Sequence, residues 1–231
     1  MTEPKIRPDR DQMTRWLRLL SVPADHPTPV DALKVENDLR SMRLRHRPWI
    51  VAAVTAVNAA NDGTRLNVPH ALPSPPTRVS AAAGADVADG VWGAYLQWTI
   101  GNADATDWLR AAIALLDPTA LVFTANDNPE PWWQNEMLIL HALHSFALRM
   151  GDMALIEKTL ACADFHLREI QPDHATNEPW SVHAYASHPD GNVTAETLLH
   201  AGYIQHGGAL GPVARQVARD ARGALAAYLK A

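Results

Sequence analysis

Apolar positions recur along most of the chain with the spacing of amphipathic helices. Met13, Trp16, Leu17 and Leu20 follow the i, i+3, i+4, i+7 pattern of one buried helix face. Comparable patterns predict helices over residues 33–44, 49–60, 86–100, 106–116, 131–150, 152–170, 193–206 and 212–229. No stretch alternates apolar and polar residues in the way that a half-buried strand does. The pattern therefore predicts an all-α fold.

Two glycine turns indicate how neighbouring helices are joined. Gly151-Asp152 and Gly207-Gly208 leave so little chain between helices that the helices on either side must run antiparallel. We therefore expect antiparallel helical hairpins in a single helical domain over residues 1–231, with a partial α/α toroid as one way of arranging them.

Three connections are longer than these turns. A proline-rich loop at about 61–84 is either a lid or a passive linker, and further loops span 117–131 and 171–192. The last two loops are separated by one hairpin, so an array of hairpins would bring them out at the same end. The sequence thus predicts a pocket where residues 126–133 and 173–183 meet.

The first of these two loops offers side chains suited to a polar ligand. Paired tryptophan rings present flat apolar faces that can stack on a sugar ring or an organic cation, and nearby carboxylates can orient such a ligand. We predict ligand contacts from Asp127, Trp132 and Trp133, and a catalytic role for Glu136. The alternative is that the two rings pack the helix into the core.

The second loop concentrates hydrogen-bonding and titratable groups between two prolines. An imidazole titrates near neutrality and can act as a general acid or base when a carboxylate orients it. The predicted catalytic residues are His174, Asn177 and His183, and the predicted ligand-binding residues are Asp173, Trp180 and Tyr185. In the alternative interpretation Asp173 caps a turn and Trp180 anchors the segment between helices.

Histidines are concentrated in the C-terminal half, where eight of the eleven lie between residues 141 and 206. His141 and His144 are three residues apart on one predicted helix, and His166 precedes Glu169 by three on the next. This spacing places each pair on one helix face, as paired metal ligands must be. These four residues are the candidates for a metal site.

Charge and apolar content limit the classes of partner. Residues 86–196 carry four Lys or Arg against sixteen Asp or Glu, so this region would repel phosphate backbones, and we predict no nucleic-acid partner. Apolar runs are too short to span a membrane, and the N-terminus has no apolar signal region, so we predict no membrane partner and a cytoplasmic location. Cys162 is the only cysteine, which excludes an internal disulfide, and its helical context predicts a buried thiol.

Three functional hypotheses follow from these residues. The first is a domain that binds or acts on a neutral, carbohydrate-like polar ligand in a pocket lined by Trp, His and acidic residues. The second is a non-catalytic interaction or scaffold domain whose basic segments, residues 40–47 and 215–222, contact a protein partner. The third is a metal-binding protein that uses histidine and carboxylate ligands. No motif identifies a cofactor.

Two short segments resemble a known family. PWWQNEM, residues 131–137, and GYIQHGG, residues 202–208, are similar to segments that occur in the same order in the α/α-toroid domain of hyaluronate- and chondroitin-type polysaccharide lyases. The resemblance implies a toroid-like arrangement of hairpins with Trp132 and Trp133 lining a saccharide cleft. Those lyases use an Asn, His, Tyr and Arg constellation whose tyrosine follows the second segment, where this chain reads ALGPVA.

Overall fold

The computed structural model describes residues 5–21, 84–117, 130–172, 179–205 and 207–230, and every regular element within them is a helix. The elements are α1 (Arg10–Leu19), α5 (Gly84–Thr99), α6 (Asp104–Ala114), α7 (Glu130–Met150), α8 (Met153–Phe165), the π-helical turn η1 (His166–Ile170), α9 (Val182–Ser187), α10 (Asn192–Gln205) and α11 (Pro212–Lys230). The predicted all-α fold is confirmed. The helices expected at 33–44 and 49–60 and the proline-rich loop at about 61–84 lie outside the described residues.

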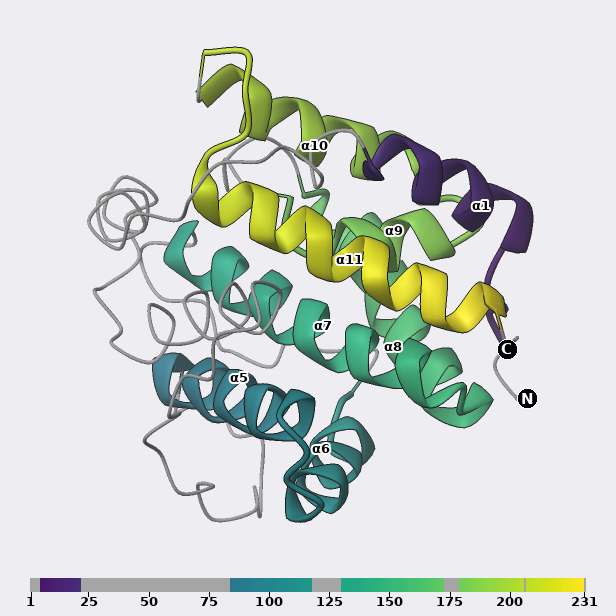
Figure 1. Ribbon diagram of the computed structural model, residues 1–231, viewed down its shortest axis with the longest axis vertical. Helices are drawn as coiled ribbons and strands as arrows, with labels where there is room; N and C mark the ends of the chain where they lie inside the picture. Colours follow the sequence, from purple (N-terminus) through teal and green to yellow (C-terminus); the bar gives the residue numbers. More distant parts are fainter. Residues whose placement is uncertain (1–4, 22–83, 118–129, 173–178, 206, 231) are drawn as a thin grey trace.

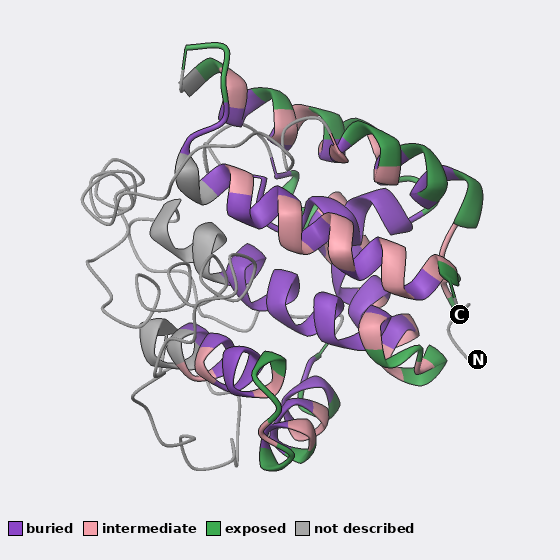
Figure 2. Cartoon of the chain, in the orientation of Figure 1, coloured by how far each residue is buried: buried purple, intermediate pink, exposed green. Residues whose placement is uncertain are grey.

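Helix α7 is the centre of the described structure. α5, α8, α9 and α11 all pack against it, while α6 packs on α5 and α8 (Figure 1). Every residue from 136 to 148 is buried, so α7 has no solvent face over this length (Figure 2). Its polar side chains must therefore find partners inside the protein.

Side-chain caps and glycines define several helix ends. Asp9 caps α1 by accepting a hydrogen bond from Gln12 N at 2.9 Å, and Asp152 caps α8 by accepting one from Ala154 N at 3.1 Å. Gly151 ends α7 with a φ of 64°, which glycine adopts without steric cost. α7 and α8 then form the predicted hairpin.

The second predicted hairpin, formed by α10 and α11, is less closely packed than expected. α10 packs chiefly on α9, and α11 packs on α7 and on α1. α10 and α11 are consecutive in sequence, but each finds its main packing partners elsewhere. The short connection between them constrains the path of the chain without making a tightly packed pair.

Helix α9 is a correction to the sequence prediction, which expected a loop over 171–192. All six of its residues are buried, so no amphipathic pattern marks it. Ser181 precedes it in the left-handed region, with a φ of 59°, and donates its backbone N–H to His141 Nδ1 at 3.1 Å. The Ser181 hydroxyl also donates to Met137 O, so the start of α9 is fastened to α7.

The turn between α9 and α10 passes so close to α9 that only glycine fits at position 191. A Cβ atom on Gly191 would collide with the backbone carbonyl of Tyr185 and lie 2.8 Å from Tyr185 Cα. Gly191→Ala is therefore expected to lower the free energy of unfolding by about 1–3 kcal/mol, the usual cost of overpacking. Urea unfolding measures this change.

Gly93→Ala is the matched control for this prediction. Gly93 lies inside α5, and among the described residues no atom beyond its own stretch of helix lies within 4 Å of the position that a Cβ would take there, so alanine should raise stability by about 0.5–1 kcal/mol through helix propensity. Equal effects of the two substitutions would contradict the close approach at Gly191.

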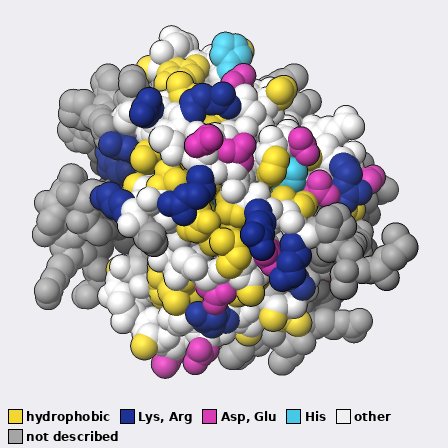
Figure 3. All heavy atoms as spheres, turned by 90° about the vertical axis from the view of Figure 1, so that its right-hand side faces the viewer, with side chains coloured by type: hydrophobic (Ala, Val, Ile, Leu, Met, Phe, Trp, Pro, Cys, Tyr) yellow, Lys and Arg dark blue, Asp and Glu magenta, His cyan; other side chains and the backbone are white. Residues whose placement is uncertain are grey.

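Buried apolar side chains from α1 and from α5 to α11 join in one core cluster. Figure 3 shows one face of the molecule, on which Lys and Arg side chains are interspersed with hydrophobic and acidic ones. Within the described ranges, no helix combines the length and the apolar character needed to cross a lipid bilayer.

Candidate functional site

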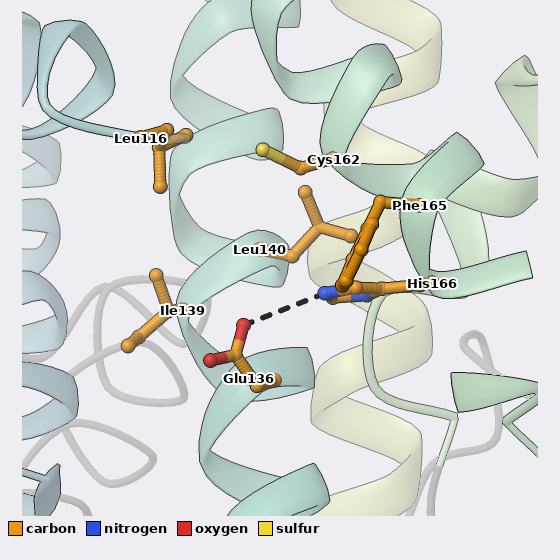
Figure 4. A pocket seen from close by; sticks show the side chains of 7 residues that line it. All are labelled: Leu116, Glu136, Ile139, Leu140, Cys162, Phe165 and His166. Atoms are coloured by element: carbon orange, nitrogen blue, oxygen red, sulfur yellow. Dashed lines mark ion pairs between the residues drawn. The ribbon is translucent and has the colours of Figure 1, made fainter. Parts of the chain in front are cut away.

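A small pocket lies where α7 faces the end of α8. Its walls are mostly apolar, but a carboxylate, an imidazole and a thiol also face it (Figure 4). The lining residues are Leu116, Glu136, Ile139, Leu140, Cys162, Phe165 and His166. We call this site the Glu136 pocket. Its volume of about 10 Å³ has room for about one water molecule or one ligand hydroxyl.

Three buried polar side chains form a chain at this pocket. Glu136 Oε2 lies 3.4 Å from His166 Nε2, and His166 Nδ1 lies 3.0 Å from Tyr185 Oη. Glu136 and His166 are each 3% exposed, and Tyr185 is fully buried. A carboxylate, an imidazole and a phenol are thus connected across α7, η1 and α9 in surroundings from which water is largely excluded.

A local irregularity of the backbone carries His166 at this position. The last turn after α8 is π-helical, and Gln171 N closes it by donating to His166 O at 2.8 Å. Gln171 itself has a φ of 50°, in the left-handed region that non-glycine residues seldom adopt. Single π-helical turns and strained backbone are found often at functional sites.

The surroundings of the pocket determine which groups are charged. Burial, together with the nearby Glu136 carboxylate, raises the pKa of the Cys162 thiol to about 12 and raises the pKa of Tyr185 well above its usual value. The thiol is therefore neutral near pH 7, as its helical context predicted, and is a poor nucleophile. The Tyr185 phenol likewise keeps its proton and can donate it to His166.

A second polar group surrounds Asp220 on α11. Four donors reach its carboxylate: Tyr95 Oη at 2.8 Å, His141 Nε2 at 3.2 Å, Ser145 Oγ at 2.7 Å and Arg149 Nη2 at 3.0 Å. Ser145 Oγ also lies 2.9 Å from His183 Nε2. We call these six residues the Asp220 cluster. It ties α5, α7, α9 and α11 together.

The cluster holds Asp220 in its ionised form. Burial alone would raise the pKa of Asp220, but the Arg149 charge and the hydrogen bonds from His141 and Ser145 outweigh burial and keep the pKa well below its usual range. His141 Nδ1 accepts the Ser181 N–H, so the ring proton must be on Nε2, where it is donated to Asp220. The negative charge is thus matched by the Arg149 charge and by three further donors.

His183, within this cluster, and His144, beside it, are neutral. Burial, followed by proximity to His141, lowers the pKa of His144 to about 3 and lowers that of His183 well below its usual value. His144 Nδ1 lies 2.8 Å from Thr159 Oγ1, and its Nε2 lies 3.3 Å from Ser187 Oγ. Both rings therefore connect helices through hydrogen bonds without carrying charge.

The structure describes only some of the predicted catalytic and ligand-binding residues. Asp127, Asp173, His174 and Asn177 lie outside the described residues, so their predicted roles stay predictions. Trp132 and Trp133 belong to α7, but their side chains are outside the described part as well. Glu136 is present at the pocket, and the structure brings it together with Tyr185 through His166.

The prediction that His183 is exposed to a pocket is wrong. His183 lies on the buried helix α9 with no exposed surface, because the loop expected there is helical and packs against α7. Trp180 is likewise buried, with its ring 5.6 Å from that of His141 and 5.5 Å from that of Trp92. It anchors the segment between helices, which was the alternative interpretation.

The four metal candidates do not converge. His141 turns to Asp220, while His144 turns to Thr159 and Ser187. The wider π-helical turn separates His166 from Glu169, and His166 pairs with Glu136 instead. Within the described ranges, no group of three or more His, Cys, Asp or Glu residues could hold a metal ion.

The Asp220 cluster contains residues that the sequence pattern did not reveal. Asp220 is 75 residues from Ser145 and 125 from Tyr95 in sequence, so local spacing could not connect them. One signal was available: His141, Ser145 and Arg149 recur every four residues on a helix that is mostly apolar beyond Glu136, which indicates a polar stripe facing a single partner.

Comparison with known proteins adds no family to these observations. The chain matches no protein-family model, no curated protein and no solved structure.

Proposed function

We propose that the protein binds a neutral polar ligand at the Glu136 pocket and that Glu136 and His166 act there as an acid–base pair. One observation carries this proposal: a buried carboxylate and imidazole, 3.4 Å apart, face a cavity sized for a single hydroxyl group. Such a pair can accept a proton from a hydroxyl and return it, provided the hydroxyl lies within hydrogen-bond reach.

A hydrogen bond to Tyr185 and a close contact with Glu136 orient His166 for this role. Tyr185 keeps its proton and can donate it to His166 Nδ1, and in that tautomer the imidazole presents Nε2–H to Glu136. A carboxylate has two oxygens that can each accept more than one hydrogen bond, so Glu136 can contact His166 and a ligand hydroxyl at the same time. The π-helical turn holds His166 in register with α7 for this contact.

The size of the cavity limits what can enter. A volume of about 10 Å³ admits one hydroxyl, so the rest of a ligand must lie outside the pocket that these seven residues line. A polyol or a sugar fits this requirement because it can insert one hydroxyl while its ring stays at the entrance. Trp132 and Trp133 precede Glu136 on α7 by four and three residues, a spacing that favours one helix face, and stacking by either ring is part of the proposal.

Ligand-observed NMR with cellobiose and N-acetylglucosamine as probes tests the proposal. Glu136→Gln is expected to weaken binding of a recognised saccharide by about tenfold, because a neutral amide replaces a charged hydrogen-bond acceptor. Glu169→Gln is the matched control, since the Glu169 side chain is 58% exposed, and its affinity should equal that of the unchanged protein. Binding that survives Glu136→Gln, or no binding of either saccharide, would count against a saccharide site here.

A non-catalytic interaction domain is the second candidate function. It is favoured by the buried positions of His141, His144 and His183, whose hydrogen bonds join helices instead of facing a ligand. In that case Glu136→Gln would lower the melting temperature without affecting the binding of any small molecule. The same NMR experiment, with a melting curve for each variant, separates the two functions.

A further inference from the structure

The outer end of the Asp220 cluster opens into a surface hollow that the proposed function does not use. Its volume is about 340 Å³, and it lies between α7 and α11. The residues that define its chemistry are Arg149, Gln216, Arg219, Asp220, Arg222 and Gly223. We propose that this arginine hollow binds a small oxyanion, a carboxylate or a phosphate, independently of the Glu136 pocket.

The charges that face the hollow favour an anion. Three guanidinium groups line it against one carboxylate. That carboxylate, Asp220, is already surrounded by four donors from α5 and α7, among them Tyr95 and His141. Guanidinium groups bind carboxylate and phosphate oxygens in a two-pronged geometry, so a cationic rim of this kind selects oxyanions over neutral ligands.

A buried amide without a partner provides independent support. Gln216 is 5% exposed and lines the hollow, yet neither its Oε1 nor its Nε2 has a hydrogen-bond partner among the described residues. Arg149 Nε is also buried without a partner in the same part of the chain. Buried polar groups are nearly always hydrogen-bonded, so these atoms indicate that a bound molecule completes the site. A ligand with an anionic oxygen and a neighbouring hydroxyl would satisfy all three atoms.

Glycine at position 223 leaves room for the Arg149 guanidinium beside the hollow. A Cβ atom at this position would lie 2.8 Å from Arg149 Nη2, so a larger residue would push the guanidinium away from Asp220. Glycine inside a helix is otherwise unfavourable. Gln216, Arg219 and Gly223 follow helical spacing along α11, which gives the hollow one continuous floor on a rigid element.

The size of the hollow restricts the ligand to a small molecule. Its volume is at the lower end of the range for small-molecule sites, and three arginines are among its lining residues. A citrate-sized carboxylate or a phosphate monoester fits this description.

Titration calorimetry with inorganic phosphate and with citrate, at one fixed ionic strength, tests the proposal and distinguishes the two anion classes. One of the two is expected to bind with a measurable heat. Arg222→Gln should weaken that binding by about tenfold, the value of one charge-assisted contact. Gln216→Leu should weaken it as well while leaving the melting temperature unchanged or higher, because the amide it removes has no partner among the described residues of the unliganded protein.

Arg18→Gln is the charge-matched control, because Arg18 is an exposed arginine on α1. It should bind the anion as the unchanged protein does, and so should Glu136→Gln. The absence of binding by both anions would overturn the proposal. An equal loss of affinity in the Arg18 and Arg222 variants would overturn it too, since that result would indicate non-specific attraction.

Discussion

Asp220→Ala is expected to lower the free energy of unfolding by about 3 kcal/mol, the lower end of the cost of removing one partner from a buried ion pair, because the Arg149–Asp220 pair is largely but not fully buried. The change would leave the Arg149 guanidinium without its counter-charge, and Tyr95, His141 and Ser145 without an acceptor. Such a loss is a large share of the stability of a typical domain. Urea unfolding followed by circular dichroism measures it.

Two further variants show whether the ion pair is the cause. Asp107→Asn removes an exposed carboxylate from α6 and should change stability by no more than about 0.5 kcal/mol. The double variant Arg149→Met/Asp220→Leu removes both charges together, and it should be more stable than Asp220→Ala because no uncompensated charge remains. A double variant less stable than the single one would mean that packing, not charge, dominates at this position.

Acidification from about pH 7.5 to about pH 5 is expected to remove about 2 kcal/mol of stability through His144, and His183 adds to this loss in the same direction. Both are neutral in the folded protein, because burial holds their pKa values below the ordinary value of 6.5. Between pH 6.5 and the folded pKa, which is about 3 for His144, the unfolded chain binds protons that the folded protein does not. Stability therefore falls as the pH falls through this window, by about 2 kcal/mol at pH 5 for His144.

Substitution of a single histidine isolates this effect. The slope of the unfolding free energy against pH measures the number of protons taken up on unfolding. Between pH 5 and 6, His144→Gln should reduce that number by about one, whatever the substitution does to stability at neutral pH. His200→Gln is the control, since His200 is exposed on α10, and its pH profile should match that of the unchanged protein. Parallel profiles for all three proteins would show that His144 is not held neutral by the fold.

The sequence predicted most of the described helices because their patterns are local. α1, α5 to α8, α10 and α11 were all predicted, with boundaries within a few residues of those observed. α9 was missed for a physical reason: a short helix that is buried on every side shows no contrast between an apolar and a polar face. The π-helical turn was missed as well, since the run from 152 to 170 reads as one uninterrupted helix.

The candidate site was predictable only in part. Glu136 and Tyr185 were recognised as chemical groups, yet their link through His166 depends on a backbone irregularity that spacing rules do not contain. The Asp220 cluster depends on contacts between helices that are far apart in sequence. A polar residue on an apolar helix indicates that the side chain will be buried and will need a hydrogen-bond partner. Which residue becomes that partner is determined by the fold.

The position of α1 has a consequence for how the protein is made. Its buried face, Met13, Trp16 and Leu20, packs on α9 and α11, and Gln12 donates to the backbone carbonyls of Ala186 and His188. At a synthesis rate of about 5–20 residues per second, a ribosome needs roughly 10–40 s to translate the chain between α1 and α11. During that interval a tryptophan-bearing apolar surface projects from the nascent chain with none of these partners yet made. The apolar face of α1 is therefore synthesised well before the helices that cover it in the folded protein.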